Sequence, residues 1–387
     1  MDKKNKNPNV PNLRFSNPYK LRKVRLGDIC TITGGYAFDS HKMKQQGEYQ
    51  IIKMGNLYNG IFDLSRNQSF INVPTKKELE YLIQKNDILI TLTGTTNKKD
   101  YGYTVQIEKP KKLLLNQRCA LIRASKVNEK YLFYLLNSND FLKQFYASST
   151  GGTGNQTNVS INDMLDFKVY ISNENDQLKI SNILNALDKK ISTQIKIIDD
   201  YNSLKIGIYN WMFKENYTDY KLKQFAYIVK GDQINNDQLL SNGSYYMMNG
   251  GTSPSGYLDS YNVSENTISI SEGGNSCGYV QFNSSPFWSG GHCYTIQNVN
   301  STLIENKYLY HYLKHKEKEI MNLRIGTGLP NIQKKDLENF TILAPSLSIQ
   351  RKNLALFEML DEKISVLNEE LASLEKQKKY LLCNMFI

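Results

Sequence analysis

The sequence has few of the features that mark a secreted or membrane protein. No stretch approaches the roughly 18 uninterrupted apolar residues that a membrane span needs. The first residues are polar and contain no apolar segment, so no signal peptide is expected. The five cysteines are an odd number and form no C-x-x-C pair, which argues against a disulfide framework and a zinc ribbon. We therefore expect a cytoplasmic protein.

Motifs of catalysis are also lacking. The chain has no Walker A pattern, no H-E-x-x-H, no glycine-rich strand–loop–helix suited to S-adenosylmethionine, and no acidic pair with a nearby lysine. Asn17-Pro18-Tyr19 is only a fragment of the aminomethyltransferase signature. The absences agree, and they predict no catalytic residue, no metal site and no cofactor in this chain.

Two histidine motifs could carry chemistry, but each has a simpler interpretation. His311 and His315 are spaced to share one helix face and could hold a metal. No carboxylate or thiolate stands beside them, so we expect an exposed helix face. His292-Cys293 suggests a nucleophile, but no partner acid is placed. Cys293 falls near the position of Cys119 in the repeat described below, which predicts buried packing.

The net charge of +11 is concentrated at one end. Residues 1–25 hold eight basic side chains against one acid, Asp2, and so supply +7 of it. We expect residues 1–20 to form a basic, flexible arm. The arm either touches nucleic-acid phosphates or is simply solvated, and the composition favours neither.

The sequence consists of two similar copies joined in tandem, which is an internal repeat. Residues 158–214 align without a gap on residues 331–387, at a constant separation of 173 residues. Upstream, residues 24–35 resemble residues 220–231, and the first copy carries 19 more residues in its globular part. An ordered series of such matches indicates a duplication whose tails are constrained in length. Identical pairs include Asn158/Asn331, Asp163/Asp336, Phe167/Phe340 and Gln177/Gln350.

The tails of equal length read as helices. In residues 177–214 and 350–387 the apolar residues recur at steps of three and four, as an amphipathic helix requires. Neither segment contains proline, and only Gly207 interrupts. Two such helices would most simply bury their stripes against each other. The alternative is two independent core helices, each inside its own domain.

The globular parts read as mixed α/β. Residues 49–54 and 87–92 look like strands in the first copy, and residues 131–146 look helical. Residues 266–271 and 278–282 look like strands in the second copy, and residues 307–323 look helical. We place the domain boundaries at 1–20 (arm), 21–172 (first head), 173–216 (first helix), 217–345 (second head) and 346–387 (second helix).

The loops of both heads offer side chains suited to nucleic-acid recognition. Amide, hydroxyl and guanidinium groups read base edges, while lysine and tyrosine contact phosphates. The alternative is that these loops merely turn between strands. The candidates are Lys53, Asn56, Thr95, Asn97, Lys98, Lys99, Tyr101 and Arg118 in the first copy, and Tyr246, Asn249, Ser253, Tyr257, Asn275, Ser276 and Tyr279 in the second.

The doubled tail resembles the specificity (S) subunit of type I restriction–modification systems. The resemblance rests on Asn158-Val159-Ser160 with Asn331-Ile332-Gln333, on a glutamine opening each helix, and on two similar helix blocks. It covers nearly the whole chain after about residue 20. The first copy lacks the proline that precedes the helix of the second, Pro345. The helix residues that carry it are Gln177, Leu187, Asp188 and Ile191, with Gln350, Leu360, Asp361 and Ile364.

The resemblance implies an α+β fold with two α/β target-recognition domains in a tandem pseudo-twofold repeat, separated by two long antiparallel coiled-coil helices. It implies a non-catalytic subunit that binds double-stranded DNA and reads a bipartite, asymmetric target. It further implies two methyltransferase (M) subunits, which bind the helices and hold S-adenosylmethionine, and restriction (R) subunits, which join for cleavage. A stand-alone nucleic-acid-modifying enzyme with an unrecognised site, or an adaptor that binds only protein, remains the alternative.

Overall fold

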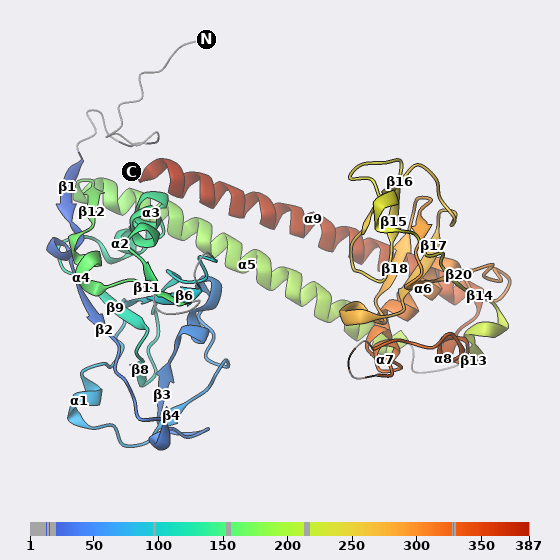
Figure 1. Cartoon of the computed structure of the whole chain (residues 1–387), viewed down its shortest axis with the longest axis horizontal. Helices are drawn as coiled ribbons and strands as arrows, with labels where there is room; N and C mark the ends of the chain where they lie inside the picture. Colours follow the sequence, from blue (N-terminus) through green and yellow to red (C-terminus); the bar gives the residue numbers. More distant parts are fainter. Residues whose placement is uncertain are drawn as a thin grey trace, which may run out of the picture. The chain divides into compact units, whose positions relative to one another are not determined.

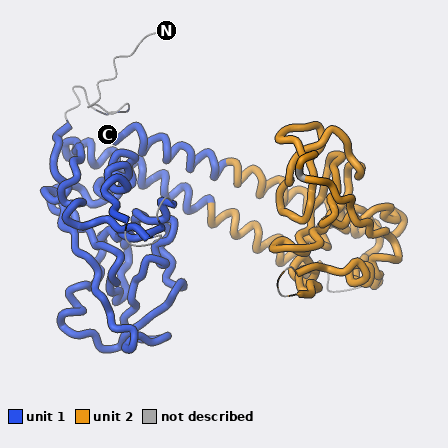
Figure 2. Tube along the Cα trace, viewed as in Figure 1, with its two compact units in different colours: residues 1–194, 370–387 blue, residues 195–369 orange. Residues whose placement is uncertain are grey.

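The structure, a computed structural model, describes residues 13, 15, 21–95, 98–151, 156–212, 217–326, 328 and 330–386. The chain divides into two compact units (Figure 2). Unit 1 comprises Met1–Gln194 and Glu370–Ile387, and unit 2 comprises Ile195–Glu369. Each unit therefore holds one globular head together with part of each long helix, α5 (Glu174–Met212) and α9 (Leu347–Met385).

The described residues of unit 1 form four small sheets (Figure 1). Their strand orders are β2-β9-β5-β7, β4-β3-β8, β1-β12 and β10-β11-β6. Pairing is antiparallel except between β3 and β8, which run parallel with Gln50 opposite Leu113. The strands are β1 (Arg22–Arg25), β2 (Cys30–Gly34), β3 (Tyr49–Ile52), β4 (Phe70–Ile71), β5 (Ile88–Thr91), β6 (Thr93–Thr95), β7 (Thr104–Gln106), β8 (Leu113–Leu115), β9 (Cys119–Ala124), β10 (Thr150–Gly151), β11 (Gln156–Asn158) and β12 (Lys168–Ile171).

Unit 2 repeats the first three of these sheets. Their strand orders are β14-β20-β17-β18, β16-β15-β19 and β13-β21, and the parallel pair recurs between β15 and β19. The strands are β13 (Thr218–Lys221), β14 (Tyr227–Lys230), β15 (Tyr245–Met248), β16 (Gly256–Leu258), β17 (Thr267–Ser271), β18 (Val280–Asn283), β19 (Trp288–Ser289), β20 (Cys293–Gln297) and β21 (Thr341–Ala344). The duplication seen in the sequence is thus a duplication of topology, and the predicted fold class is confirmed.

Short helices cover the sheets in each unit. In unit 1 they are α1 (Lys76–Leu79), α2 (Glu129–Leu135), α3 (Asn139–Ala147) and α4 (Ile161–Asp166). In unit 2 they are α6 (Asn306–His315), α7 (Glu317–Met321) and α8 (Lys334–Glu338). Each helix predicted after the sheet is therefore two helices. In unit 1 the break has a clear cause, because the Ser138 hydroxyl accepts from the Phe141 amide and starts α3.

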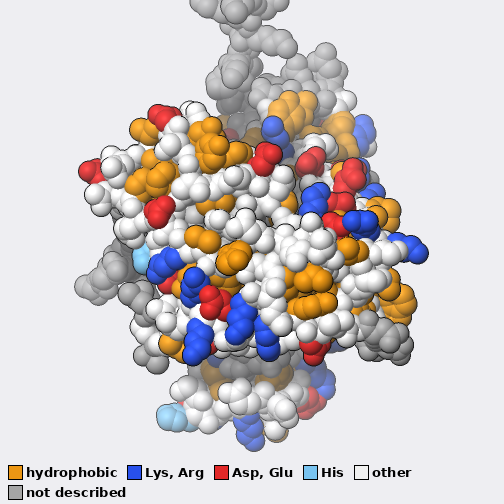
Figure 3. Space-filling model, turned by 90° about the vertical axis from the view of Figure 1, so that its right-hand side faces the viewer, with side chains coloured by type: hydrophobic (Ala, Val, Ile, Leu, Met, Phe, Trp, Pro, Cys, Tyr) orange, Lys and Arg blue, Asp and Glu red, His pale blue; other side chains and the backbone are white. Residues whose placement is uncertain are grey.

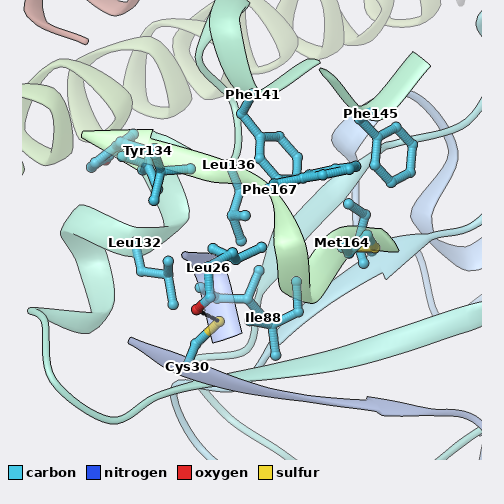
Figure 4. Packing of buried hydrophobic residues seen from close by; sticks show 14 of the residues in the cluster. Leu26, Cys30, Ile88, Leu132, Tyr134, Leu136, Phe141, Phe145, Met164 and Phe167 are labelled. Carbon is cyan, nitrogen blue, oxygen red and sulfur yellow. Dashed lines mark hydrogen bonds between the residues drawn. The ribbon is translucent and has the colours of Figure 1, made fainter. Parts of the chain in front are cut away.

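The long helices supply part of each head's core. Figure 4 shows Leu26, Met164 and Phe167 packed in the buried cluster of unit 1. The same cluster includes Leu184 of α5 and Phe386 of the second tail. The Phe386 ring lies 5.3 Å from the Tyr131 ring. In unit 2 a separate core forms around β17, β20 and α6, and Phe357 of α9 is buried in a small cluster with α5. The apolar faces of α5 and α9 therefore pack on the heads as well as on each other.

The two long helices pair antiparallel within each unit. In unit 1 the Gln194 side chain of α5 donates to Glu370 of α9 at 3.0 Å. In unit 2 the Tyr209 ring of α5 stacks on the Phe357 ring of α9, with centroids 4.2 Å apart. As the residue number rises on α5 it falls on α9, which defines the antiparallel direction. The predicted paired helices are confirmed, and the alternative of two independent core helices is wrong.

Both helices start three residues before the glutamines that were expected to open them. In the first copy the Asn173 side chain accepts from the Asp176 amide at 2.9 Å and so caps the helix. In the second copy the Ser346 carbonyl accepts from the Gln350 amide. None of the helices in the described part of the chain combines the length and apolar character that crossing a bilayer requires.

Candidate nucleic-acid interface

Backbone hydrogen bonds define equivalent loop positions in the two heads. The Leu92 amide donates to the Arg118 carbonyl at 2.9 Å, and the Glu272 amide donates to the His292 carbonyl at 2.9 Å. Next, Val159 donates to Leu92 in unit 1 as Ile332 donates to Glu272 in unit 2. Arg118 and His292 therefore occupy one structural position, and Leu92 and Glu272 occupy another.

A close backbone approach recurs beside these loops. A Cβ atom placed on Gly35 would lie 2.0 Å from the Asn116 carbonyl oxygen, and one on Gly231 would lie 2.3 Å from the Ser289 carbonyl oxygen. No side chain fits at such distances, so only glycine lets the chain cross at this point. In both heads the segment that follows β2 or β14 is thereby held against the segment that leads into β9 or β20.

In unit 1, two candidates border one hollow. Lys53 and Arg118 line a hollow of about 360 Å³ together with Gln117. The Lys53 ammonium donates to the Ser69 hydroxyl at 2.6 Å, while the Arg118 side chain is exposed. Arg118 has a φ of 72°, a left-handed conformation that turns the chain sharply at this point. Lysine and arginine in one hollow form a donor-rich surface.

A second group in unit 1 lies on the turn after β6. Lys98 and Lys99 are exposed, and the Lys99 ammonium lies 5.3 Å from the Tyr146 ring. Thr95 donates through its amide and hydroxyl to Asp100, and these hydrogen bonds lower the pKa of Asp100. Asn97 lies outside the described residues.

Two candidates of unit 1 are structural. Asn56 is fully buried, and its amide donates to the carbonyl oxygens of Asp63 and Arg66 at 2.8 and 2.6 Å. Tyr101 is also buried, against the rings of Phe145 and Tyr146. Neither side chain is presented at the surface, and this burial argues against a contact with DNA.

In unit 2, hydrogen bonds bring three loops together. The side-chain oxygen of Asn249 accepts a hydrogen bond from the backbone amide of His292 at 3.0 Å. The hydroxyls of Ser271 and Ser276 both donate to the Gly250 carbonyl, at 2.7 and 2.6 Å. The loops after β15 and β17 and the loop before β20 therefore form one surface, on which Ser253 and Asn275 are exposed.

The tyrosines of unit 2 serve different purposes. Tyr257 lines a hollow with Asn249 and Pro254. Tyr279 lies under the Lys314 ammonium, which is 4.1 Å from its ring centroid. Tyr246 stacks on Phe287 and donates to Asn283, and burial raises its pKa. Tyr246 is therefore fixed by a ring contact and a hydrogen bond within its own head.

Glu272 was not among the predicted site residues, yet it joins the loops of unit 2. Its carboxylate accepts from Lys230 at 2.6 Å and from the Tyr294 hydroxyl at 3.0 Å, and the His292 ring lies 3.7 Å away. The equivalent residue of unit 1 is the buried Leu92. A sequence signal existed, since an acid in the glycine-rich Ser271-Glu272-Gly273-Gly274 segment lacks a counterpart in the first copy.

Charges on the visible face of unit 2 are mixed. Figure 3 shows basic side chains lying among acidic ones there, without a broad area of one sign. Affinity for a polyanion at this face would therefore depend on particular side chains more than on a general positive field.

Groups suited to catalysis do not converge in the described residues. They contain no group of three or more His, Cys, Asp or Glu that could hold a metal ion. Burial raises the pKa of Cys119 to about 12 and that of Cys293 to about 11, so both thiols stay protonated. The packing predicted for Cys293 is confirmed. His311 is also buried, against Tyr209, so the expectation of an exposed helix face is wrong.

The predicted helix residues split into two groups. Gln177 accepts from the Asn128 amide and donates to the Ser172 carbonyl, and Gln350 accepts from Glu305 and donates to Pro345. Both glutamines thus anchor a helix to its own head. Leu187, Ile191, Leu360 and Ile364 are half-buried or buried along the helices, and Asp188 and Asp361 form ion pairs.

Two heads of one topology, joined to a shared helix pair and differing in their loop side chains, define a tandem recognition protein. Comparison with known families makes this specific. The model of the type I restriction modification DNA specificity domain matches residues 18–199 and again residues 214–376. The chain belongs to this family.

Individual relatives agree. The chain is 34% identical over 127 residues to a putative type I specificity subunit of Mycoplasma pneumoniae, and 32% identical over 127 residues to one of Mycoplasma genitalium. The first match spans 33% of this chain and 34% of the relative, so the chain aligns with about a third of these curated relatives.

Solved structures share the fold. The S subunit of a type I system from M. genitalium matches 98% of this chain and 99% of its own with a TM-score of 0.68, at 18% identity. A chain from a study of complex assembly and conformational transition of the type I R-M system matches 94% of this chain and 96% of its own with a TM-score of 0.57, at 16% identity.

Proposed function

We propose that this chain is the non-catalytic DNA-reading subunit of a type I restriction–modification complex. It reads a bipartite, asymmetric DNA target and positions methyltransferase and restriction subunits on it. The observation that carries the proposal is one loop architecture, present twice, with different side chains at equivalent positions.

The equivalence extends to the candidate reading residues. Asn116 donates to the Ile52 carbonyl in unit 1 as Gly290 donates to the Met248 carbonyl in unit 2. The residues that follow Ile52 and Met248, Lys53 and Asn249, are therefore equivalent. Together with Arg118 and His292, each head presents a pair of polar side chains at the same place, but the chemistry of the pairs differs.

The two pairs of side chains are suited to the edges of different bases. Lysine and arginine donate to the O6 and N7 acceptors of guanine, whereas asparagine pairs with the donor and acceptor of adenine. Two heads with a shared backbone and different pairs would read two different half-sequences. A homodimeric reader, with identical heads, would read an inverted repeat.

The remaining functions fall to partners. S-adenosylmethionine is expected in the methyltransferase subunits, of which two would match the two repeats. The exposed surface of α5 and α9 is the natural place for these subunits, because the paired stripe already occupies the inner faces. The basic arm at residues 1–20 would add phosphate contacts in this setting.

Reconstitution tests the proposal. The purified chain is incubated with DNA and labelled S-adenosylmethionine, alone and with its methyltransferase partner. We expect no methyl transfer or cleavage from the chain alone, and sequence-specific methylation from the complex. Robust activity of the chain alone would indicate a stand-alone enzyme. A complex that shows no salt-dependent DNA shift would indicate a protein-only adaptor.

A further inference from the structure

The helix pair contains one ion pair twice. In unit 1 the Lys378 ammonium of α9 lies 2.7 Å from the Asp188 carboxylate of α5. In unit 2 Lys205 of α5 contacts Asp361 of α9. The two aspartates are 173 residues apart in sequence, and so are the two lysines. The internal repeat therefore maps one ion pair onto the other.

Both pairs lie at the edge of the helix interface. The side chains are 29% and 32% exposed at Asp188 and Lys378, and 40% and 19% exposed at Asp361 and Lys205. Each pair also meets its own head at an equivalent residue. The Tyr134 hydroxyl donates to Asp188 at 2.8 Å, and His311 lies 3.7 Å from Asp361.

The positions of these charges oppose a slip of the helices. Along an apolar stripe, a shift by one heptad of seven residues restores most apolar contacts, so such stripes define register weakly. In this chain a one-heptad shift would place Asp188 opposite Leu371 or Met385. It would place Lys205 opposite Leu354 or Asn368. In both directions charges would lose their partners and meet mostly apolar side chains.

We propose that Asp188–Lys378 and Asp361–Lys205 together set the axial register at which α5 and α9 pair, and that all four are positioning residues. If the chain reads a bipartite target, as proposed above, this register also determines the number of base pairs between the half-sequences. Only this second consequence rests on the proposed function.

Cysteine cross-linking of the intact chain reports the register without DNA. In a Cys383→Ser background, Gln194→Cys with Glu370→Cys reports the native register, since these side chains are hydrogen bonded. Gln194→Cys with Lys363→Cys or with Gln377→Cys reports a one-heptad slip in either direction. In the native register those partners are displaced by about 10 Å along the helix, beyond the roughly 7 Å Cα separation that a disulfide spans.

The decisive variant replaces all four charged residues by leucine: Asp188→Leu, Lys205→Leu, Asp361→Leu and Lys378→Leu. Replacing a buried ion pair by apolar residues often leaves stability unchanged or raises it, so the leucine variant is expected to fold. We expect a folded chain in which slipped cross-links rise roughly tenfold, because no unpaired charge opposes the shift. A folded variant with only the native cross-link would overturn the proposal.

Two further variants keep the test informative. The first variant swaps all four charges: Asp188→Lys, Lys378→Asp, Asp361→Lys and Lys205→Asp. It should give the native cross-link in full yield, whereas Asp188→Lys alone should give it in reduced yield. A swap that fails to restore it contradicts the proposal. The matched control changes four exposed charges on the same helices, Lys196→Leu, Asp199→Leu, Glu369→Leu and Lys376→Leu, and should keep the native register.

Methylation mapping then separates the two consequences. With the partner methyltransferase, the leucine variant should modify sites whose gap differs by about three base pairs, since a heptad rises about 10 Å and a base-pair step about 3.4 Å. Slipped cross-links with an unchanged gap would overturn the role of the helices in target spacing, and leave the register assignment supported.

Discussion

The heads of units 1 and 2 share three sheets and a glycine-dependent chain crossing. They differ in the polarity of equivalent interior positions. Leu92 in unit 1 corresponds to Glu272 in unit 2, and the latter is surrounded by Lys230 and Tyr294. Tyr134 of α2 in unit 1 corresponds to His311 of α6 in unit 2, each beside the aspartate of its helix ion pair.

The comparison identifies which features the architecture requires. Backbone crossings and strand pairing recur in both copies, whereas polar residues at the loop centre do not. A reading head can thus change the chemistry of its loops while its backbone stays the same. This is the behaviour expected of a scaffold that presents variable contacts.

We expect the greatest loss of stability from substitutions at the glycine crossing that both heads share. Gly35→Ala or Gly231→Ala would place a Cβ atom against a backbone carbonyl that cannot move aside. We expect each variant to destabilise its own head by about 4 kcal/mol or more. Thermal unfolding and limited proteolysis measure the loss, and equal stability of wild type and Gly35→Ala would contradict the shared crossing.

The matched control for these glycines lies in α5. A Cβ atom added at Gly207 would have no neighbouring atom within 4 Å, so Gly207→Ala meets open space. We expect this variant to stabilise the helix by about 1 kcal/mol, because alanine favours the helical backbone more than glycine does.

A smaller loss of stability is expected when Leu92 and Glu272, which distinguish the two loops, are each replaced by the other's residue type. Leu92→Glu would bury a carboxylate in unit 1 without the lysine and tyrosine that hold Glu272, at a cost of about 3 kcal/mol. Glu272→Leu should cost only about 1 kcal/mol, because Lys230 is half-exposed and can return to water. Denaturant unfolding of both variants compares them. A larger loss for Glu272→Leu would show that the carboxylate is more important to unit 2 than its contacts indicate.

A pH titration should separate the units further. Burial lowers the pKa of His311 to about 4, from about 6.5 when unfolded, so neutral His311 stabilises unit 2 above pH 6.5. Stability should fall by about 2 kcal/mol as the pH drops from 6.5 towards 4, because the unfolded state binds the proton more readily. His315, whose pKa burial also lowers, adds in the same direction.

Hydrogen exchange measures this titration locally. Amides of α6 should lose protection between pH 6.5 and 4, while those of α2 should not, since burial raises the pKa of Tyr134 away from this range. The His311→Gln variant serves as the control and should flatten most of the dependence at α6. Equal loss of protection in both helices would refute the assignment to His311.

The smallest effect concerns recognition itself. If each head reads one half-sequence, as proposed above, Lys53→Ala and Arg118→Ala should weaken discrimination within one half, and Asn249→Ala within the other, each by about 1–2 kcal/mol. Mapping of methylated sites with the reconstituted complex reads both halves at once. Exposed Lys111→Ala, outside these loops, is the matched control. Relaxation of both half-sequences by a single variant would show that the heads do not read independently.

Much of this architecture could be predicted from the sequence because its signals are local or repeated. The duplication, the long helices and the main strands follow from identities at a constant separation and from apolar periodicity. The equivalence of Cys119 and Cys293 as buried residues followed from the same alignment. The boundaries placed at 173 and 346 lie one residue before the observed helix starts. The glutamines expected to open the helices lie three residues inside them, because the capping by Asn173 lies outside the apolar pattern.

The candidate interface depended far more on tertiary structure. The sequence alone determined that two similar heads and two matched helices exist, since repetition and periodicity need no knowledge of distant contacts. The folded structure was needed to establish that Asn56 and Tyr101 are interior, that Glu272 joins the loops of unit 2, and that His311 is covered by α5. It also decided which charges on the helices meet. Burial and ion pairing depend on residues far apart in the chain, and no local pattern records which distant side chain a given residue will face.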